Sequence, residues 1–165
     1  MKQRIVVIGA LLLGFLAVGP ARADAAFKTF LFVPGIAGSA TEIHHVDWIE
    51  VLSMSQGVAS TKKAVSCSDV SVMKSLDEAG PALWVAAAMG QVFPELRLHV
   101  VNSEGAIVYD LKFTNGRVTS TQTSGSSELP TESVSFSYQT LTLTFNPQDS
   151  TGHVIPGIPQ TISCQ

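Results

Sequence analysis

The stretch that decides the fold is Ala106-Ile-Val-Tyr-Asp-Leu-Lys-Phe113, in which apolar and polar side chains alternate. The odd-numbered residues from Ile107 to Phe113 share one face of an extended chain, whereas Asp110 and Lys112 lie on the other. A strand with one buried face and one solvated face is typical of an antiparallel sheet. The stretch therefore predicts a mainly β fold.

Segments with the same two-residue period, rich in Thr, Ser, Val and Phe, flank this stretch on both sides. Asn115-Gly116 is a typical two-residue hairpin turn, so we expect the chain to reverse direction there. The polar residues 120–131 and the tail 150–160, which contains Gly and Pro, predict irregular structure. We expect strands at 27–33, 46–54, 64–74, 94–101, 106–113 and 117–122.

The segment 132–146 changes the phase of its alternation. Apolar side chains occupy even positions up to Tyr138 and odd positions from Leu141 onward. Because a slip of one residue exchanges the two faces of a strand, a bulge or sharp bend near Gln139 and Thr140 is predicted.

One helix is predicted at 81–89. Pro81 suits the first helical turn, and Gly90 suits the position just past the helix end. An apolar stripe would face the core, formed by Leu83, Trp84, Ala87 and Ala88.

The first 25 residues have the order of a cleavable secretory signal. Met1-Lys-Gln-Arg4 is basic, Ile5–Val18 is uncharged and apolar, and an A-x-A motif closes at both Ala23 and Ala25. We favour cleavage after Ala25. The apolar run is shorter than the roughly 20 residues of a membrane span, although an uncleaved anchor is the alternative interpretation.

Removal of this leader leaves one domain at 26–165, with 7 basic and 12 acidic residues. A mildly acidic chain of this kind lacks the basic surface that would attract nucleic acids or anionic membranes. About 140 residues suffice for a single hydrophobic core. We expect no second domain, and no membrane span after cleavage.

The chain has two cysteines, Cys67 and Cys164. Export would place them in an oxidising compartment, where an even pair favours one disulfide that fixes the C-terminal tail to the body. The alternative is two unpaired thiols, one of them buried.

Pro34-Gly-Ile-Ala-Gly-Ser39 follows a predicted strand but fits no phosphate-binding or nucleophile motif. A P-loop needs Lys and Ser or Thr after its second Gly, and a nucleophile elbow needs Gly on both sides of the Ser. The two glycines are better explained as turn residues. A hydrolase that uses a serine such as Ser39 is the most distant hypothesis.

One cluster of metal-capable side chains lies just after this segment. Adjacent histidines in an extended chain point to opposite faces, so we interpret the cluster as a polar loop without a metal. His99 and His153 are expected to stand alone. We therefore predict no enzyme activity, no metal and no cofactor. The cluster comprises Glu42, His44, His45, Asp47 and Glu50.

Six segments, taken in order, resemble the Hcp family, the ring-forming tube proteins of bacterial type VI secretion. The likeness covers nearly all of residues 26–165 at similar spacing. The segments are Phe32-Val-Pro-Gly-Ile-Ala-Gly-Ser-Ala-Thr41, His45-Val-Asp-Trp-Ile-Glu-Val-Leu-Ser-Met-Ser-Gln-Gly57, Asp69-Val-Ser-Val-Met-Lys74, Gly80-Pro81, Phe93-Pro-Glu-Leu96 and Leu129-Pro-Thr-Glu-Ser-Val-Ser-Phe136. Its signature positions are Gly35, Gly38, Asp47, Trp48, Ile49, Gly57, Pro81, Pro94, Thr131 and Glu132.

The resemblance implies a small antiparallel β-barrel with one flanking helix, a hexameric ring and stacking of rings into a tube that carries or conducts cargo. Secretion-apparatus or effector proteins are the implied partners.

Two features depart from the family pattern. Its tube proteins are normally made without a leader, and the connection at 58–64 is short where relatives carry a longer extension that contacts the next ring. The resemblance therefore implies the ring more directly than the stack.

Two hypotheses from different classes follow. The first is an exported, non-enzymatic ring protein that works in the periplasm or outside the cell. The second is an exported binding module that receives a small ligand or a partner protein on its apolar helix or at the barrel mouth.

Overall fold

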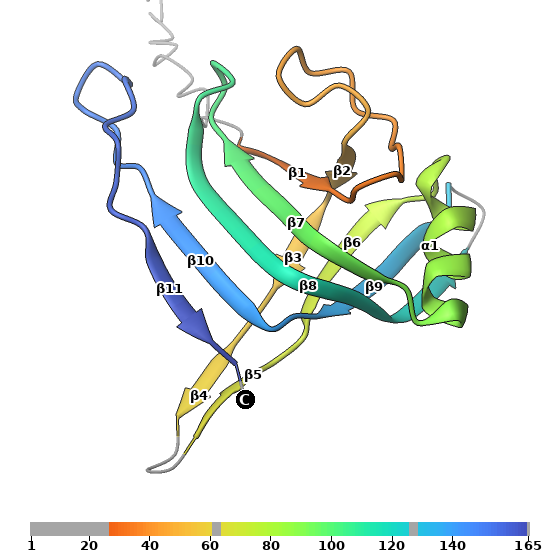
Figure 1. Ribbon diagram of the computed structural model, residues 1–165. Helices are drawn as coiled ribbons and strands as arrows, with labels where there is room; N and C mark the ends of the chain where they lie inside the picture. Colours follow the sequence, from red (N-terminus) through yellow and green to blue (C-terminus); the bar gives the residue numbers. More distant parts are fainter. Residues whose placement is uncertain (1–26, 61–63, 126–128, 165) are drawn as a thin grey trace, which may run out of the picture.

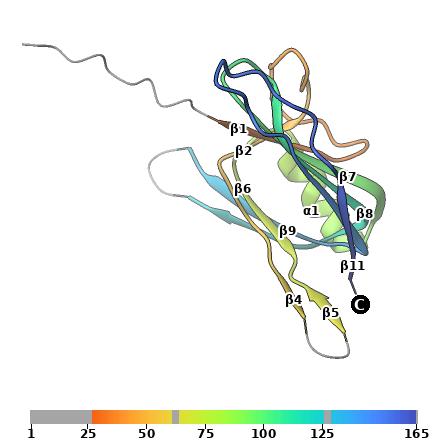
Figure 2. The same cartoon turned by 90° about the vertical axis from the view of Figure 1, so that its left-hand side faces the viewer.

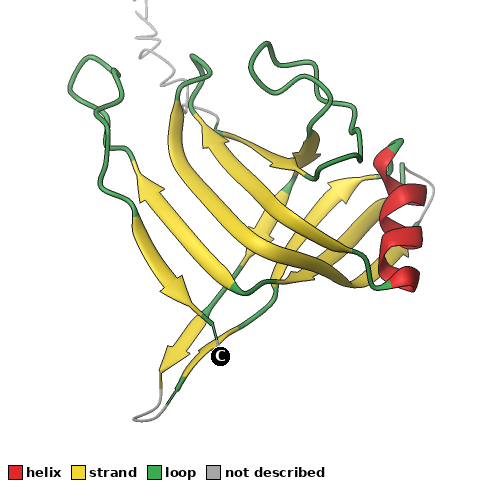
Figure 3. Cartoon of the chain, in the orientation of Figure 1, coloured by secondary structure: helices red, strands yellow, loops and turns green. Residues whose placement is uncertain are grey.

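The computed structural model describes residues 27–60, 64–125 and 129–164, so the predicted leader lies outside the described part of the chain. The described residues form one large antiparallel sheet, a small two-stranded sheet and one helix (Figure 1, Figure 3). The elements are β1 (Lys28–Phe32), β2 (Ile49–Val51), β3 (Ser53–Ser55), β4 (Val58–Ser60), β5 (Val65–Cys67), β6 (Val70–Ser75), α1 (Ala79–Met89), β7 (Val92–Val101), β8 (Ile107–Ser124), β9 (Thr131–Ser137), β10 (Thr140–Phe145) and β11 (Gln160–Ser163).

The large sheet follows the order β2-β1-β7-β8-β9-β6-β3, and β10 pairs with both β8 and β11. The two ends of this path, β2 and β3, are separated by Leu52 alone, whose N–H donates to the carbonyl of Met73 at 2.7 Å. The first and last strands of this path are therefore joined through one bent segment of the chain. The predicted mainly β fold with one helix is confirmed. Closure of the sheet into the predicted β-barrel is not detected, since no ladder of hydrogen bonds joins the two end strands among the described residues.

The core lies on the face that the alternating stretch predicted. Leu111 and Phe113 of β8 are fully buried opposite Leu98 and Leu96 of β7. Leu83 of α1 packs into the same cluster. The predicted apolar face of 106–113 is therefore the centre of the fold.

The predicted hairpin at Asn115-Gly116 is wrong. β8 continues through both residues to Ser124, so 120–124 is also strand rather than loop. Gly116 lies opposite Phe93 of β7, and a Cβ atom there would overlap Leu96 Cδ1. The glycine allows β7 and β8 to come close together, while Asn115 takes a positive φ of 50°. The dipeptide bends the strand without reversing it.

The predicted break in 132–146 is confirmed between β9 and β10. It lies opposite the bend in β8, because the Gln139 N–H donates to the Thr114 carbonyl at 2.9 Å and Asn115 Nδ2 donates to Gln139 Oε1 at 2.5 Å. β9 pairs with β8 beyond the bend and β10 pairs with it before the bend. The bend in β8 and the break between β9 and β10 therefore lie side by side, so the neighbouring strands change direction at the same place.

We expect Gly116→Ala to destabilise the fold by about 1–3 kcal/mol, because the added methyl group overpacks the contact with Leu96. Urea-induced unfolding would measure the loss. Gly125→Ala is the matched control, since a Cβ there meets Pro130 at an ordinary 3.5 Å. Equal stability of the two variants would contradict the close approach at Gly116.

Two other predicted strands are shorter or interrupted in the structure. The strand expected at 46–54 begins only at Ile49 and bends at Leu52, and the strand expected at 64–74 is interrupted after Cys67. The connection at 58–64 is not a plain loop: β4 and β5 pair antiparallel and project from the body as an arm (Figure 1, Figure 2). We call residues 58–60 and 64–67 the arm.

The helix α1 begins at Ala79, two residues earlier than predicted, and ends as expected at Gly90. Gly90 has a φ of 61° and its N–H reaches the last carbonyls of the helix. The predicted stripe is partly wrong, since Leu83 is buried whereas Trp84 faces outward. Within the described residues, no helix has the length and apolarity needed to cross a membrane.

Candidate functional site

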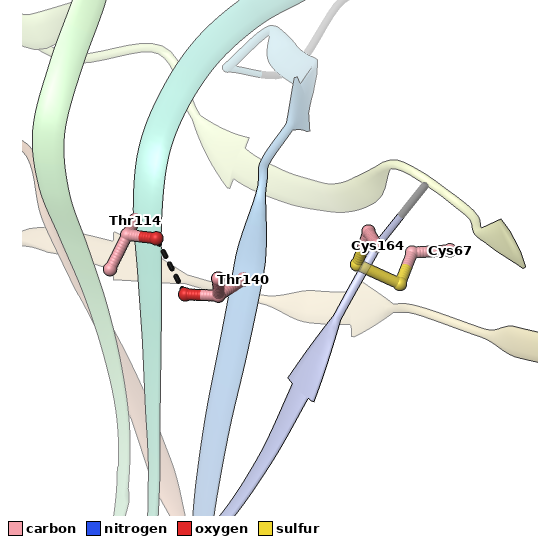
Figure 4. Close-up of a disulfide and its surroundings, with 4 residues drawn as sticks. All are labelled: Cys67, Thr114, Thr140 and Cys164. Carbon is pink, nitrogen blue, oxygen red and sulfur yellow. Dashed lines mark hydrogen bonds between the residues drawn. A yellow bond between two sulfur atoms is a disulfide. The ribbon is translucent and has the colours of Figure 1, made fainter. Parts of the chain in front are cut away.

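Cys67 and Cys164 form a disulfide, as predicted, with Cα atoms 5.5 Å apart (Figure 4). Cys67 ends β5 and Cys164 follows β11, so the bond joins the arm to the C-terminal end of the chain. In the same view, the hydroxyls of Thr114 and Thr140 are 2.5 Å apart and link β8 to β10. The disulfide therefore fixes the arm to an edge of the large sheet.

Gly57, one of the signature positions, lies at the base of this arm. Its carbonyl accepts the Ser68 N–H at 2.8 Å, and a Cβ on Gly57 would approach Ser68 Oγ to 3.3 Å. The side chains of β4 are all exposed. The arm is thus held by its own ladder, by this base contact and by the disulfide.

Glu132, a second signature position, belongs to a buried ionic cluster. Lys74 is fully buried, and its Nζ lies 2.7 Å from Glu132 Oε2 and 2.6 Å from Asp77 Oδ1. Lys74 Nζ also donates to the Ser75 carbonyl at 2.8 Å. Asp77 Oδ1 accepts the N–H of Ala79 at 2.9 Å. The cluster ties β6 and β9 to the start of α1.

The helix start fits closely over this cluster. A Cβ on Gly80 would lie 2.8 Å from both carboxylate oxygens of Glu132, so only glycine leaves room for them. Pro81 is exposed one residue further on. Thr131 pairs with both Ser75 and Ser124 at the end of β9. The Gly80-Pro81 and Thr131-Glu132 segments of the resemblance therefore meet in space.

Pro94 lies in β7 between two residues that pair with β8, Phe93 and Glu95. β1 pairs with β7 only from Arg97 onward, so β1 has no register partner at position 94. Proline lacks an N–H and is tolerated at such edge positions.

The remaining signature positions shape the loop between β1 and β2. The Gly38 N–H donates to the Asp47 carbonyl at 2.8 Å, and a Cβ on Gly38 would meet the Trp48 carbonyl oxygen at 2.5 Å. Gly35 and Asp47 have positive φ values of 78° and 61°. Gly35 is a turn residue, as expected, whereas Gly38 lies outside the turn and lets the two ends of the loop come together just before Ile49 enters the core.

Two histidines that are 54 positions apart meet under this loop, and the expectation that His99 stands alone is wrong. His45 Nε2 lies 2.9 Å from His99 Nδ1, and His45 Nδ1 lies 2.5 Å from Glu42 Oε2. Both rings are buried, with His45 1% exposed. The pair forms because the loop lies across β7, a contact that the separate sequence positions did not indicate.

The other members of the predicted polar cluster do not converge on this pair. His44, Asp47 and Glu50 are exposed. Among the described residues, no group of three or more His, Cys, Asp or Glu side chains has an arrangement that could hold a metal ion. Burial pushes the pKa of Glu42 upward, but hydrogen bonds from His45 and from the His44 backbone outweigh it and lower the pKa below its ordinary value. His153 lies apart, on an exposed turn with Thr151.

Ser39 lines two pockets among the described residues, and neither has a histidine in its lining; the larger one is shallow. It opens between this loop and residues 76–78, and its polar side chains besides Ser39 are Thr41, Asp47, Asp77 and Glu78. A serine without a neighbouring base lacks the activation that nucleophilic catalysis requires.

The outer side of α1 is an apolar surface. The segment 79–89 contains no charged residue, and Trp84, Val85 and Met89 are 49%, 56% and 76% exposed. A helix that is apolar on every side is typical of a buried helix. We call these three residues the α1 face.

These features define a structural protein whose distinctive chemistry lies in its surfaces, its arm and its buried polar clusters. The family model described as "Type VI secretion system effector, Hcp" matches residues 30–145. A solved structure of a type six secretion system protein is 30% identical, with a TM-score of 0.77, over 84% of this chain and 96% of that chain. No curated protein matches the chain.

Two further solved structures agree with this result. A type VI secretion system effector from Yersinia pestis is 25% identical, with a TM-score of 0.71, over 82% of this chain and 98% of that chain. Hcp1 from Salmonella typhimurium has the same fold at 23% identity, with a TM-score of 0.74 over 84% of this chain and 95% of that chain. The chain belongs to the Hcp family, the non-enzymatic tube proteins of type VI secretion. Proteins of this family form hexameric rings and are secreted.

Proposed function

We propose that this chain assembles into a homohexameric ring that carries or conducts cargo, and that it works outside the cytoplasm after residues 1–25 are removed. The α1 face is the observation that carries the proposal. It leaves three large apolar side chains exposed on a helix without charges. A neighbouring copy in a ring would cover this surface.

The geometry of a ring supports this assignment of the α1 face. A closed ring with a rotation axis uses two different surfaces on each protomer, one meeting the other on the next copy. Exposed apolar side chains also occur away from the helix, at Phe145, Ile155 and Ile158. In Figure 1, α1 and the β10–β11 region lie on opposite sides of the molecule. We propose that these two regions meet between neighbouring copies.

The disulfide supports the proposed export. Disulfides persist in oxidising compartments and are rare in the cytoplasm. A signal peptide cleaved after Ala25 would deliver Cys67 and Cys164 to the periplasm or the medium, where the bond forms. Partners there would be effector proteins or components of a secretion apparatus.

The mass in solution of residues 26–165, measured by light scattering, tests the ring. We expect six copies per particle and ring-shaped particles in negative stain. Trp84→Asp should shift the protein to the monomer, because it places a charge in an apolar contact. Trp84→Phe is the matched control and should remain hexameric.

A monomeric wild-type chain at high concentration would contradict the ring and favour the binding module. If Trp84→Asp remained hexameric, the proposed ring would stand, but the α1 face would not be its interface.

A further inference from the structure

The loop from Ala40 to Trp48 packs against the sheet through the buried ring of His45, through Ala40 and through the half-buried Trp48. The His45 ring stacks on Phe30 with centroids 4.7 Å apart and meets the edge of Trp48 at the same distance. Phe30 also packs with Ala40 and Val101 in a small apolar cluster separate from the main core. The loop therefore covers its own small core, with His45 at the centre.

The protons in this site can be assigned from the hydrogen bonds. An ionised Glu42 only accepts, so His45 Nδ1 carries a proton and His45 Nε2 of a neutral ring does not. His45 Nε2 then accepts from His99 Nδ1. His99 Nε2 is left with a lone pair that lies 3.4 Å from Asp110 Oδ1, and neither buried atom has a hydrogen-bond partner.

This arrangement limits how many protons the closed loop can hold. One added proton places a donor at His99 Nε2, facing Asp110, and keeps the bond between the rings, but it puts a charge on a buried ring, and this burial lowers the pKa of His99 in the closed state. A second added proton would put two N–H groups against each other across 2.9 Å and break that bond. With the loop away from the sheet, each ring is solvated and takes its own proton. The open state therefore binds more protons than the closed state.

We propose that residues 40–48 form an acid-released latch, closed at neutral pH by the His45–His99 pair and opened when the pair takes up protons. Opening would expose Phe30 and Trp48 as an apolar surface. The inference concerns regulation of this loop and does not rest on ring assembly.

The surroundings of His99 set the pH range. Burial is the largest influence and lowers the pKa of His99 from 6.5 to about 4, with Asp110 raising it and His45 and Arg97 lowering it. Because the pKa is lowered in the closed state, closure is complete above pH 6.5 and is lost as the pH falls toward 4. The charged groups around the pair are Glu42 and His44 from the loop, Lys28 from β1, Glu50 from β2, Arg97 from β7, Glu104 from the following turn, and Asp110 and Lys112 from β8.

Hydrogen exchange measured by NMR on residues 26–165 tests the latch. The amides of Ala40, His45 and Asp47 are bonded within the loop, to Trp48, Glu42 and Ala40. Their protection factors, which correct for the pH dependence of intrinsic exchange, should fall about 30-fold between pH 7.5 and pH 5, as a change in pKa from 6.5 to about 4 requires. The amides of Leu98 and Leu111 in the sheet should keep their protection.

A pair of histidine substitutions supplies the control. His99→Gln should remove the pH dependence of loop protection, whereas His44→Gln, next to His45 but exposed, should retain it. A flat profile in the wild-type chain would overturn the proposal. A parallel loss at Leu98 and Leu111 would also overturn it, because the acid effect would then be global unfolding, and this comparison needs no variant to fold.

Discussion

A chain in which Cys67 and Cys164 are both replaced by serine is expected to lose about 4–5 kcal/mol of its unfolding free energy. The two residues are 97 positions apart, and the chain-entropy model assigns a stabilisation of this size to a disulfide that closes so long a loop. Urea-induced unfolding followed by circular dichroism would measure the loss.

Reductant supplies the control for this prediction. Wild-type protein treated with a thiol should fall to the stability of the double variant, while the double variant should not respond. If reduction left the wild-type transition unchanged, the bond would not constrain the unfolded chain. The expected loss also bears on the proposed export, since a reducing cytoplasm would leave the arm without its covalent attachment to the C-terminal end.

The alternation of apolar residues was sufficient to predict the centre of the sheet. Leu111 and Phe113 are buried because a strand exposes and buries side chains in turn. The same rule located the break near Gln139, where burial passes from the even positions of Phe136 to the odd position of Leu141. These features depend on local sequence, so the sequence could predict them.

The false hairpin has a physical reason in tertiary packing. Asn-Gly favours a tight turn when nothing else competes, but Gly116 is used for the approach of Leu96, which lies 20 residues earlier. In the sequence, a glycine that forms a turn cannot be distinguished from a glycine that permits close strand packing. The distinction depends on the partner strand.

The two buried polar clusters could not be assembled from sequence because their members come from distant segments. A signal for one of them does exist. Lys74 continues the buried phase of Val70 and Val72, and Glu132 continues that of Val134 and Phe136. A charged residue in the core phase of a strand needs a partner, and two such residues in separate strands are candidates for each other. No comparable pattern indicates that His45 meets His99.

Replacement of Lys74 by methionine is the second large effect that we expect, at about 3–5 kcal/mol of lost stability. The substitution keeps an unbranched side chain, one atom shorter, but removes the cation that lies 2.7 Å from Glu132 and 2.6 Å from Asp77. Both carboxylates would remain nearly buried without an opposite charge, which is the costly way to break a buried ion pair. Asp77 also holds the first turn of α1 through the Ala79 N–H, so the helix start should loosen as well.

The same substitution at an exposed lysine is the control for this effect. Lys112 lies 3.8 Å from Glu95 at the surface, where an ion pair contributes at most about 1 kcal/mol, so Lys112→Met should unfold close to the wild-type urea concentration. Adding Glu132→Gln to Lys74→Met should recover part of the loss, because the amide carries no charge that needs a partner. The wild type, Lys74→Met, Glu132→Gln and the double variant form a double-mutant cycle. If Lys74→Met were as stable as Lys112→Met, the cluster would add no net stability, and the burial of Lys74 would have to be explained by hydrophobic packing of its methylene groups alone.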